Sequence, residues 1–475
     1  MSNIVFVSPT LSLEEQYGKL AFGGSTEALL GLCYLAACTR EKGHGTWIVD
    51  MQAMGLGYQE AVDKILENDP ECVGITSVTL AIGNAYKLAG MIKARDPRVT
   101  IIIGGAHVTA VPEETMSRYA DGFDVGVVGE GERTITELLE AIEGGKPLDH
   151  IRGIIFHDKS LDKFKYTERI GLVSDLDDLP MPAWDLLPDI SKHYIPTTYA
   201  IDRLPSFSLV TTRGCAFKCT FCDRSVFGNK YRKHSPGYII SMLKDLYFNY
   251  GIRDIRFNDD EFMLSKTHLS VLCESILKEK LDITWSCLAR VDSVTYELLT
   301  LMRRSGCRQI RFGIESGSQS ILDEIKKGIT IDDVRKAVSM TKKAGIRTIG
   351  FFMMALPGET MDTIRETVDF AKELDLDDFK MNYYAPFPGS QLYKDIDKYG
   401  TADLSWEKMN MHTRPSFLPH GLTEEQLIKM NKYAFRSFYL RPKVIFSYIM
   451  RTTDITRLRV LIKGVIALLN FWLRK

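Results

Sequence analysis

Along the first 150 residues, short apolar runs alternate with stretches in which apolar positions recur at helical spacing. The apolar runs fall at residues 4–7, 46–51, 72–78 and 99–105, and residues 28–43 and 58–68 have the helical pattern. Near-continuous β-branched runs separated by helices are typical of a parallel sheet that is covered on both faces. We therefore expect residues 1–150 to form a Rossmann-like or flavodoxin-like α/β domain, with ligands bound along the carboxyl edge of its strands.

A second series of alternating strands and helices begins near residue 206. Its six candidate strands lie at residues 207–213, 254–259, 283–289, 309–316, 347–355 and 379–385. Each of them except the last is followed by a helical pattern, which predicts a partial (β/α)6 barrel of the TIM type over residues 201–400. Active-site groups of such barrels lie at the carboxyl ends of the strands, so we expect the chemistry there.

Two regions lie outside these series. Residues 151–200 are irregular and rich in Asp and Pro, and the prolines at 180, 182 and 188 would interrupt any long helix. We expect them to form a connector that packs against both halves. Residues 401–475 have helical patterns and are expected to form a helical C-terminal region.

The cysteines are unevenly placed along the chain. Three of the nine, Cys215, Cys219 and Cys222, fall within eight residues directly after the first barrel strand. A structural zinc site usually takes four ligands, and no second cysteine pair lies nearby. Three thiolates in one loop suit an iron–sulfur cubane, which normally takes four cysteines, and they would leave one iron open for a chelating substrate. A zinc loop or a coincidental group of buried thiols remain the alternatives.

With Phe221 before its last cysteine, the segment TTRGCAFKCTFCD resembles the signature of the radical S-adenosylmethionine superfamily. The resemblance implies a [4Fe–4S] cluster on the three cysteines and S-adenosylmethionine chelated to the fourth iron. It also implies reductive cleavage of S-adenosylmethionine to a 5′-deoxyadenosyl radical, with a one-electron reductant such as flavodoxin or ferredoxin. The residues that the resemblance places near S-adenosylmethionine are Phe221, Arg290, Glu315, Ser316 and the 356–359 turn.

Asp259 and Asp260 follow the second barrel strand. They are expected either to orient the substrate or the cysteine segment, or to serve only in a turn. No catalytic residue acting on the substrate can be assigned from the sequence.

The N-terminal half carries a second resemblance. Its segments GGAHVTAVPEE and DVGVVGEGE resemble loops of cobalamin-binding radical S-adenosylmethionine enzymes, in the branch of the anaerobic magnesium-protoporphyrin monomethyl ester cyclase and the hopanoid enzymes. Glycines there would let the backbone approach a large flat ring. The residues that the resemblance places around cobalamin are Ser77, Gly104, Gly105, His107, Thr109, Gly129, Glu130 and Gly131.

Several points remain open in this half. The chain lacks the Asp-x-His-x-x-Gly pattern that supplies a lower axial histidine to cobalt in other cobalamin proteins, so the cobalt ligand is not predicted. An alternative interpretation of His107 is a structural or capping histidine. An alternative interpretation of the whole domain is a platform for a substrate or a partner, without a cofactor.

The two resemblances together imply a cobalamin-dependent radical enzyme that methylates an unactivated carbon of a small or lipophilic substrate. The same cofactors would also serve an oxidative cyclisation or a rearrangement. Two further alternatives are a tRNA methylthiotransferase-like enzyme and a cobalamin-binding protein without turnover. The substrate itself is not predicted.

Composition and charge bear on the partners and the cellular location of the protein. A formal net charge of −1 gives no reason to expect nucleic-acid binding. Nine cysteines without an export signal favour the reducing cytoplasm over a disulfide framework. From Arg441 onward the chain is basic, and its apolar positions include Phe471 and Trp472. Such a helix either lies in a membrane interface as a peripheral contact or packs on the barrel.

Overall fold

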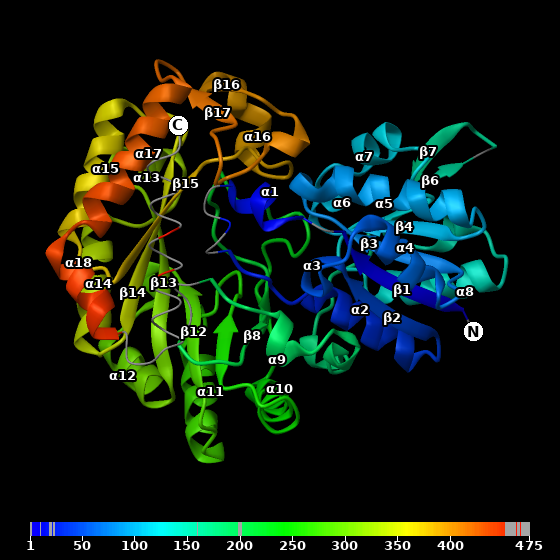
Figure 1. Ribbon diagram of the computed structural model, residues 1–475, viewed down its shortest axis with the longest axis horizontal. Coiled ribbons are helices and arrows are strands. Elements are labelled where there is room, and N and C mark those ends of the chain that lie inside the picture. The colour runs from blue at the N-terminus through cyan, green and yellow to red at the C-terminus, as the bar shows by residue number, and fades with distance from the viewer. Residues whose placement is uncertain are drawn as a thin grey trace.

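The computed structural model describes residues 2–9, 11–18, 21, 24–158, 160–197, 202–451, 462 and 466. Two α/β halves lie side by side, with the N-terminal half in blue and cyan and the C-terminal half in green to orange (Figure 1). Each half is built on its own sheet, and the carboxyl edges of both sheets contribute to the region between them.

The N-terminal half is a doubly wound sheet of seven strands. The strands are β1 (Asn3–Ser8), β2 (Gly45–Asp50), β3 (Cys72–Thr76), β4 (Thr100–Gly104), β5 (Val125–Val127), β6 (Ile154–Asp158) and β7 (Lys163–Tyr166). Their order is β2-β1-β3-β4-β5-β6-β7, and the first five are parallel. The order 2-1-3-4-5 is that of flavodoxin-like folds, which confirms the predicted fold class.

Helices cover both faces of this sheet. On one face lie α2 (Leu30–Glu41) and α8 (Glu132–Glu143), and on the other lie α4 (Tyr58–Leu66) and α5 (Ile82–Arg95). Apolar residues of each helix bury against the strands, as Leu138 of α8 does on the first face and Leu88 of α5 on the second. The strands are buried on both faces, which explains why they read as continuous apolar runs.

The hairpin of β6 and β7 corrects the expected extent of the connector. Residues 154–166 were expected to be irregular, but both strands pair antiparallel at the edge of the first sheet. The irregular connector therefore begins only after Tyr166. Its Trp184 is buried and donates to Asp245 of the second half at 2.7 Å, so the connector does contact both halves.

The C-terminal half contains the predicted partial barrel. Its strands are β8 (Ser206–Leu209), β11 (Asp254–Phe257), β12 (Thr284–Ala289), β13 (Cys307–Glu315), β14 (Arg347–Met354) and β15 (Asp378–Tyr383). All six are parallel and follow one another in chain order from one edge to the other. The barrel helices are α10 (Pro236–Asn249), α11 (Lys266–Glu279), α12 (Tyr296–Arg304), α14 (Ile331–Lys343) and α15 (Met361–Glu373).

Capping residues mark the start of several of these helices. Ser235 caps α10 by accepting from the backbone of Tyr238, with Pro236 in the first turn. Thr330 and Asp333 form a capping box at the start of α14. These capped starts place each helix directly after the loop that follows a strand.

The C-terminal region is only partly helical, contrary to the expectation for residues 401–475. It begins with an antiparallel pair, β16 (Gly400–Ala402) and β17 (Phe417–Pro419), before α17 (Glu424–Tyr439) and α18 (Pro442–Arg451). Helix α17 packs on β15 and so covers the last strand of the barrel. Phe471 and Trp472, on which the membrane expectation rests, lie outside the described residues.

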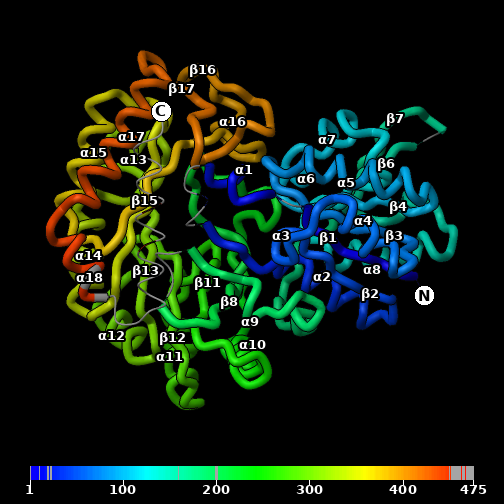
Figure 2. The backbone as a smooth tube through the Cα atoms, in the orientation of Figure 1, coloured from blue at the N-terminus to red at the C-terminus, as the bar shows by residue number. Residues whose placement is uncertain are grey.

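The N-terminal segment crosses from the first half to the barrel. The tube in Figure 2 shows α1 (Leu13–Tyr17) lying between the two halves. Asn410 donates to the carbonyl oxygen of Glu15 at 2.6 Å, and Glu27 pairs with the buried Arg256 of β11 at 2.6 Å. The first half is therefore connected to the barrel by its own N-terminal segment as well as by the connector.

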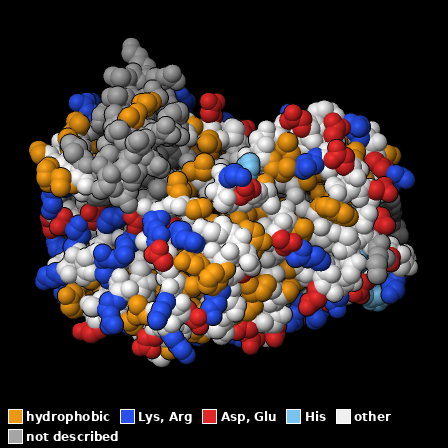
Figure 3. All heavy atoms as spheres, turned by 60° about the horizontal axis from the view of Figure 1, so that its bottom comes forward, with side chains coloured by type: hydrophobic (Ala, Val, Ile, Leu, Met, Phe, Trp, Pro, Cys, Tyr) orange, Lys and Arg blue, Asp and Glu red, His pale blue; other side chains and the backbone are white. Residues whose placement is uncertain are grey.

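The surface agrees with the near-zero net charge. On the face shown in Figure 3, acidic and basic side chains are interspersed among small apolar groups. Among the helices that the structure describes, none has the length and apolar character needed to cross a membrane.

Replacing Phe438 with alanine tests the packing of α17 on the barrel. Its ring is 1% exposed and stacks on Phe379 of β15 with ring centroids 5.0 Å apart. We expect Phe438→Ala to lower the free energy of unfolding by about 3–5 kcal/mol, because it leaves a cavity. Urea unfolding followed by circular dichroism measures the loss.

Tyr433→Ala on the same helix is the control, because Tyr433 is 48% exposed. It should change the free energy by about 0.5 kcal/mol or less. Equal effects of the two substitutions would show that α17 does not pack on the barrel.

Candidate cofactor sites

The three clustered cysteines lie in a loop that is closed at its base. Strand β9 (Thr212–Arg213) pairs antiparallel with β10 (Arg232–Lys233), so residues 214–231, here called the cysteine loop, leave and return at one point. Gly214 has φ +83°, and a Cβ there would lie 2.4 Å from the carbonyl oxygen of Lys230. Only glycine fits this tight base, directly before Cys215.

The middle of the cysteine loop is held by backbone contacts from two barrel segments. The N–H of Thr220 donates to the carbonyl oxygen of Ile325 at 3.0 Å, and its carbonyl oxygen accepts from Leu392 at 3.0 Å. Gly389 has φ +89°, and a Cβ there would lie 2.3 Å from an oxygen of Asp223. The segments that follow β13 and β15 therefore fix the position of the cysteine loop.

The donor set of this loop fits a cluster with three protein ligands. Cys215 is half-buried, Cys219 is buried and Cys222 is exposed, and all three thiols are free. In the described part of the chain, no three His, Cys, Asp or Glu side chains are placed to bind a single metal ion. By their number alone, three thiols on one fixed loop suit an iron–sulfur cluster that takes one further, non-protein ligand.

Arg290 lies beside the cysteine loop, at the end of β12. Its Nη1 is 4.0 Å from the Sγ of Cys219, and its guanidinium stacks 3.6 Å from the ring of Phe217. The other guanidinium nitrogens already donate to Asp292 at 3.0 and 2.9 Å. Arg290 can therefore donate to a cluster sulfur, while the expected contact with the S-adenosylmethionine carboxylate stays a prediction.

Glu315 ends β13 in a strained conformation. Its φ is +67°, next to a register shift between β13 and β14, and such strain often marks functional positions. The carboxylate accepts from Lys327 at 2.7 Å, and the Lys327 ammonium lies 5.9 Å from the ring of Phe221. Sequence reasoning missed Lys327, because a lysine after a helix carries no local signal of this pairing.

Ser316 lies in the turn that directly follows β13. The residue is fully buried, and its hydroxyl shares a hydrogen bond with Thr367 at 3.0 Å and accepts from the backbone of Ser318 at 3.1 Å. Its side chain stabilises the turn after β13, and its expected contact with S-adenosylmethionine stays a prediction. This turn packs closely on α15, where a Cβ at Gly317 would lie 2.7 Å from Phe370.

The carboxylates after β11 support the base of the cysteine loop. Asp259 accepts from the backbone and hydroxyl of Thr211, and Asp260 accepts from Gly214 at 3.2 Å. Burial raises the pKa of Asp259 to about 6. Of the expected alternatives, the structure favours the role in orienting the loop.

Two further acids are buried: Glu261, which the sequence did not single out, and Glu359 of the expected 356–359 turn. Burial raises the pKa of Glu261 to about 7, although Arg290 and Lys327 act in the opposite direction. Burial also raises the pKa of Glu359 to about 8, and its carboxylate accepts from the backbone of Leu356 at 3.0 Å. Glu359 thereby closes the 356–359 turn.

A cavity of about 210 Å³ opens at the carboxyl edge of the first sheet. Its apolar wall comes mainly from the strands and from α2 and α8, with Phe6, Leu32, Leu35, Ile102 and Ile135. Of the residues expected around cobalamin, Gly104, Gly105, Gly129, Glu130 and Gly131 line it. From the other half come Arg213, Val226 and Phe227, so the cysteine loop forms part of this cavity.

The glycines around the cavity keep its backbone bare. Gly105 has φ +103°, and a Cβ there would lie 2.6 Å from the carbonyl oxygen of Ser77. Thr109 does not line the cavity. Its hydroxyl donates to the carbonyl oxygen of Gly105 at 2.8 Å and accepts from the N–H of Gly129 at 3.0 Å. Thr109 therefore holds the two glycine segments together, and the glycines leave the backbone beside the cavity accessible to a ligand.

His107 and Ser77 are not among the residues that line the cavity, and their expected contact with cobalamin stays a prediction. His107 is fully buried, with Nδ1 3.2 Å from the hydroxyl of Thr79 and its ring 4.3 Å from that of Trp406. Burial lowers its pKa to about 4. The Ser77 hydroxyl donates to the carbonyl oxygen of Val78 at 2.9 Å. The structure thus favours the alternative reading of His107 as a structural histidine.

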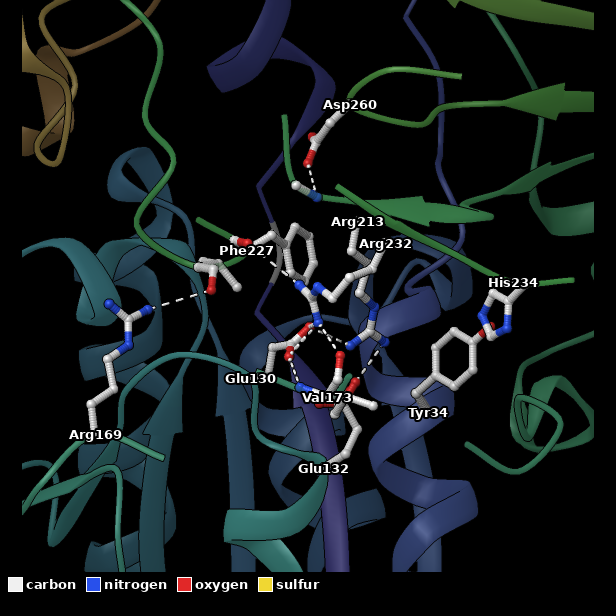
Figure 4. Close-up of polar contacts among 12 residues, drawn as sticks. Tyr34, Glu130, Glu132, Arg169, Val173, Arg213, Phe227, Arg232, His234 and Asp260 are labelled. Atoms are coloured by element: carbon white, nitrogen blue, oxygen red, sulfur yellow. Dashed lines mark hydrogen bonds and ion pairs between the residues drawn. The ribbon is translucent and has the colours of Figure 1, made fainter. Parts of the chain in front are cut away.

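Buried ion pairs join the cavity to the cysteine loop (Figure 4). Glu130 pairs with Arg213 at 2.9 Å and with Arg232 at 2.8 Å, and Glu132 pairs with Arg213 at 2.6 Å. Burial alone would lower the pKa of Arg213, but Glu132 and Glu130 outweigh it and raise that pKa. Sequence reasoning missed both arginines, although their places at the two ends of the cysteine loop were visible.

Comparisons with known proteins agree with this geometry. Residues 209–371 match the family model of the Radical SAM superfamily, and residues 24–139 match that of the B12 binding domain. The uncharacterized methyltransferase PH0819 of Pyrococcus horikoshii is 37% identical over 428 residues, covering 89% of this chain and 90% of that protein. The anaerobic magnesium-protoporphyrin IX monomethyl ester cyclase of Rubrivivax gelatinosus is 27% identical over 416 residues, covering 86% and 73%.

Two solved structures share the fold of nearly the whole chain. The cobalamin-dependent S-adenosylmethionine radical enzyme OxsB, with aqua-cobalamin and S-adenosylmethionine bound, has a TM-score of 0.75 and 19% identity, covering 98% of this chain and 72% of that one. The radical S-adenosylmethionine methyltransferase TsrM of Kitasatospora setae has a TM-score of 0.70 and 17% identity, covering 93% and 90%. The arrangement of the two halves is therefore shared with these proteins.

Replacing Gly389 with alanine tests how the cysteine loop is held. The new methyl group would overlap Asp223, so we expect the loop to shift and the cysteines to lose their common position. The protein, reconstituted with iron and sulfide without oxygen, should hold clearly less of both than the wild type, as measured by colorimetric assay.

Gly421→Ala is the matched control, because Gly421 has a similar φ of +79° but nothing within 4 Å of the added methyl. It should keep its iron and sulfide. If Gly389→Ala also kept a full complement, the contact with Asp223 would not matter for the loop.

Proposed function

The chain belongs to the cobalamin-dependent radical S-adenosylmethionine enzymes, and on this basis we propose that it methylates a carbon atom of a small-molecule substrate. The observation that carries the proposal is the shared wall: Val226 and Phe227 of the cysteine loop line the cavity of the B12 binding domain. Two reactive centres held this close suit a reaction in which a substrate radical receives a methyl group. The relative with 37% identity carries the name methyltransferase.

The residues that would hold the cofactors follow from the geometry. Cys215, Cys219 and Cys222 would hold the [4Fe–4S] cluster, and the glycine segments beside Glu130 would hold cobalamin. When bound, the cluster supplies the electron that cleaves S-adenosylmethionine, and cobalamin supplies the methyl group.

Other side chains would keep the reaction geometry. Arg290 would donate to the sulfur of Cys219, and the Glu315–Lys327 pair would fix the strand end beside Phe221, where we infer that S-adenosylmethionine binds. The buried apolar wall of the cavity would exclude water from the radical.

Oxidative cyclisation is the second candidate, favoured by the 27% identity to the cyclase over most of the chain. Both reactions would use the same cofactors and a one-electron reductant such as flavodoxin or ferredoxin. They differ in products, since methylation forms S-adenosylhomocysteine beside 5′-deoxyadenosine, whereas cyclisation forms only the latter. The match to a B12 binding domain leaves the methylthiotransferase alternative without support.

Cleavage of S-adenosylmethionine tests the proposed function without knowledge of the substrate. The full chain, loaded with iron, sulfide and hydroxocobalamin, should form 5′-deoxyadenosine when given S-adenosylmethionine and titanium(III) citrate. Cys219→Ala should abolish the product, because the cluster loses a ligand, and chromatography measures it.

Cys38→Ala removes a buried free thiol outside the cysteine loop and should leave product formation unchanged. Intact S-adenosylmethionine with the wild type would contradict the proposal and favour a cobalamin-binding protein without turnover.

We place the protein in the cytoplasm, supported by its free cysteines, with peripheral contact to the inner face of the membrane. The contact is supported by α18, where Ile445, Phe446 and Met450 are 44%, 62% and 64% exposed. A basic, apolar helix surface suits anionic lipid headgroups and a lipophilic substrate.

Flotation with anionic liposomes tests this contact. The Ile445→Glu, Phe446→Glu double variant should be recovered with the vesicles clearly less than the wild type, because it buries less apolar surface and repels the headgroups. Tyr433→Glu on α17 is the control for added charge at a residue 48% exposed. Equal recovery of all three proteins would end the membrane proposal.

A further inference from the structure

We propose that Glu130 is a positioning residue that couples the two cofactor sites, so that an iron–sulfur cluster on the cysteine loop strengthens cobalamin binding in the cavity. The inference rests on the proposed function, because it takes cobalamin as the ligand of the cavity. It goes further in assigning the coupling to named contacts.

The cysteine loop has two functional sides. Its first part carries Cys215, Cys219 and Cys222, and its later part carries Val226 and Phe227, which line the cavity. Both ends of the loop meet in the β9–β10 ladder. A cluster that fixes the cysteines therefore also restricts the part of the loop that covers the cavity.

Glu130 holds the base of this loop against the first sheet. One carboxylate oxygen accepts from both Arg213 and Arg232, the residues that flank the loop, and the other accepts from the backbone of Val173 at 2.7 Å. The side chains of Glu130 and Arg232 are 2% exposed, and that of Arg213 is 7% exposed. Because a buried charge without its partner is strongly unfavourable, the ladder and the glycine segment move as one unit.

A second contact closes the other side of the same loop. Arg169 of the connector donates to the carbonyl oxygen of Ser225, and its Nε lies 3.1 Å from the place that a Cβ of Gly129 would take. Gly129 directly precedes Glu130. The glycine segment is thus joined both to the base of the loop and to the part of it beside the cavity.

Because the cluster and cobalamin would each restrict the same loop, binding at either site is predicted to strengthen binding at the other. If a cluster on the loop favours the closed cavity, it raises the affinity for cobalamin, and cobalamin stabilises the cluster by the same factor. A merely structural ion pair would keep the halves together without making one affinity depend on the other site.

The affinity of the full chain for hydroxocobalamin, with and without the cluster, tests the inference. Anaerobic titration followed by visible difference absorption should show binding at least about 5-fold tighter in the cluster-loaded wild type than in the cluster-free protein. In Glu130→Gln, which keeps the shape but removes the charge, the ratio of the two affinities should fall below about 2-fold.

The control is Asp177→Asn. Asp177 also joins the connector to the barrel, since it accepts from His234 and from the backbone of Ser235, but it does not line the cavity. It should keep the wild-type ratio. Arg213→Lys is the second variant, should Glu130→Gln not fold. A single ammonium in place of a fork that reaches both Glu130 and Glu132 should also lower the ratio.

The outcomes separate the inference from the proposed function. Equal affinities in the two forms of the wild type would overturn the coupling, and an unchanged ratio in the folded Glu130→Gln protein would overturn the role of Glu130. Absence of cobalamin binding in both forms would overturn the proposed function, and the inference with it.

Discussion

The two halves of this molecule meet across buried charges. Glu130 and Glu132, at the carboxyl edge of the first sheet, face Arg213 and Arg232 at the base of the cysteine loop, with pair distances of 2.6 to 2.9 Å. Two carboxylates and two guanidiniums balance one another, which makes their burial tolerable and their separation unfavourable. The position of each half relative to the other, and hence the shape of the region between them, depends on this group.

The position of these buried ion pairs determines how the rest of the site is arranged. Both sheets turn their carboxyl edges toward the same region, as α/β folds do with their ligand-binding edges. The glycine segments of the first sheet and the cysteine loop of the barrel can then share one cavity wall. Backbone contacts through Thr220 and the close approach of Gly389 fix the loop from the barrel side. The cysteine loop is thereby held at its base by the buried ion pairs, in its middle by Thr220, and at Asp223 by the close approach of Gly389.

Much of the fold and part of the site could be predicted from the sequence. The six barrel strands and four of the five parallel strands of the first sheet could be predicted, because apolar periodicity is a local signal. The cluster site could be predicted because the spacing of the three cysteines alone restricts the kind of metal cluster that they can bind. The β6–β7 hairpin was missed, since its strands are short and partly exposed.

Side-chain contacts within the site could not be predicted. His107 and Ser316 lie in the expected loops, but their side chains pack against Trp406 and Thr367, which are distant in the chain. The pairing of Glu130 with Arg232 spans 102 residues and leaves no periodic trace. Contacts between residues so distant in the chain can be recognised only in the folded structure, where the two halves lie together.

The central claim is that one chain holds a cluster and a corrin at adjacent sites. The most direct measurement is the content of iron, sulfide, zinc and cobalamin in a single preparation made without oxygen and supplied with all four. The account predicts about four iron and four sulfide per chain, together with one cobalamin and no zinc. Zinc on the three cysteines in place of iron and sulfide would contradict it.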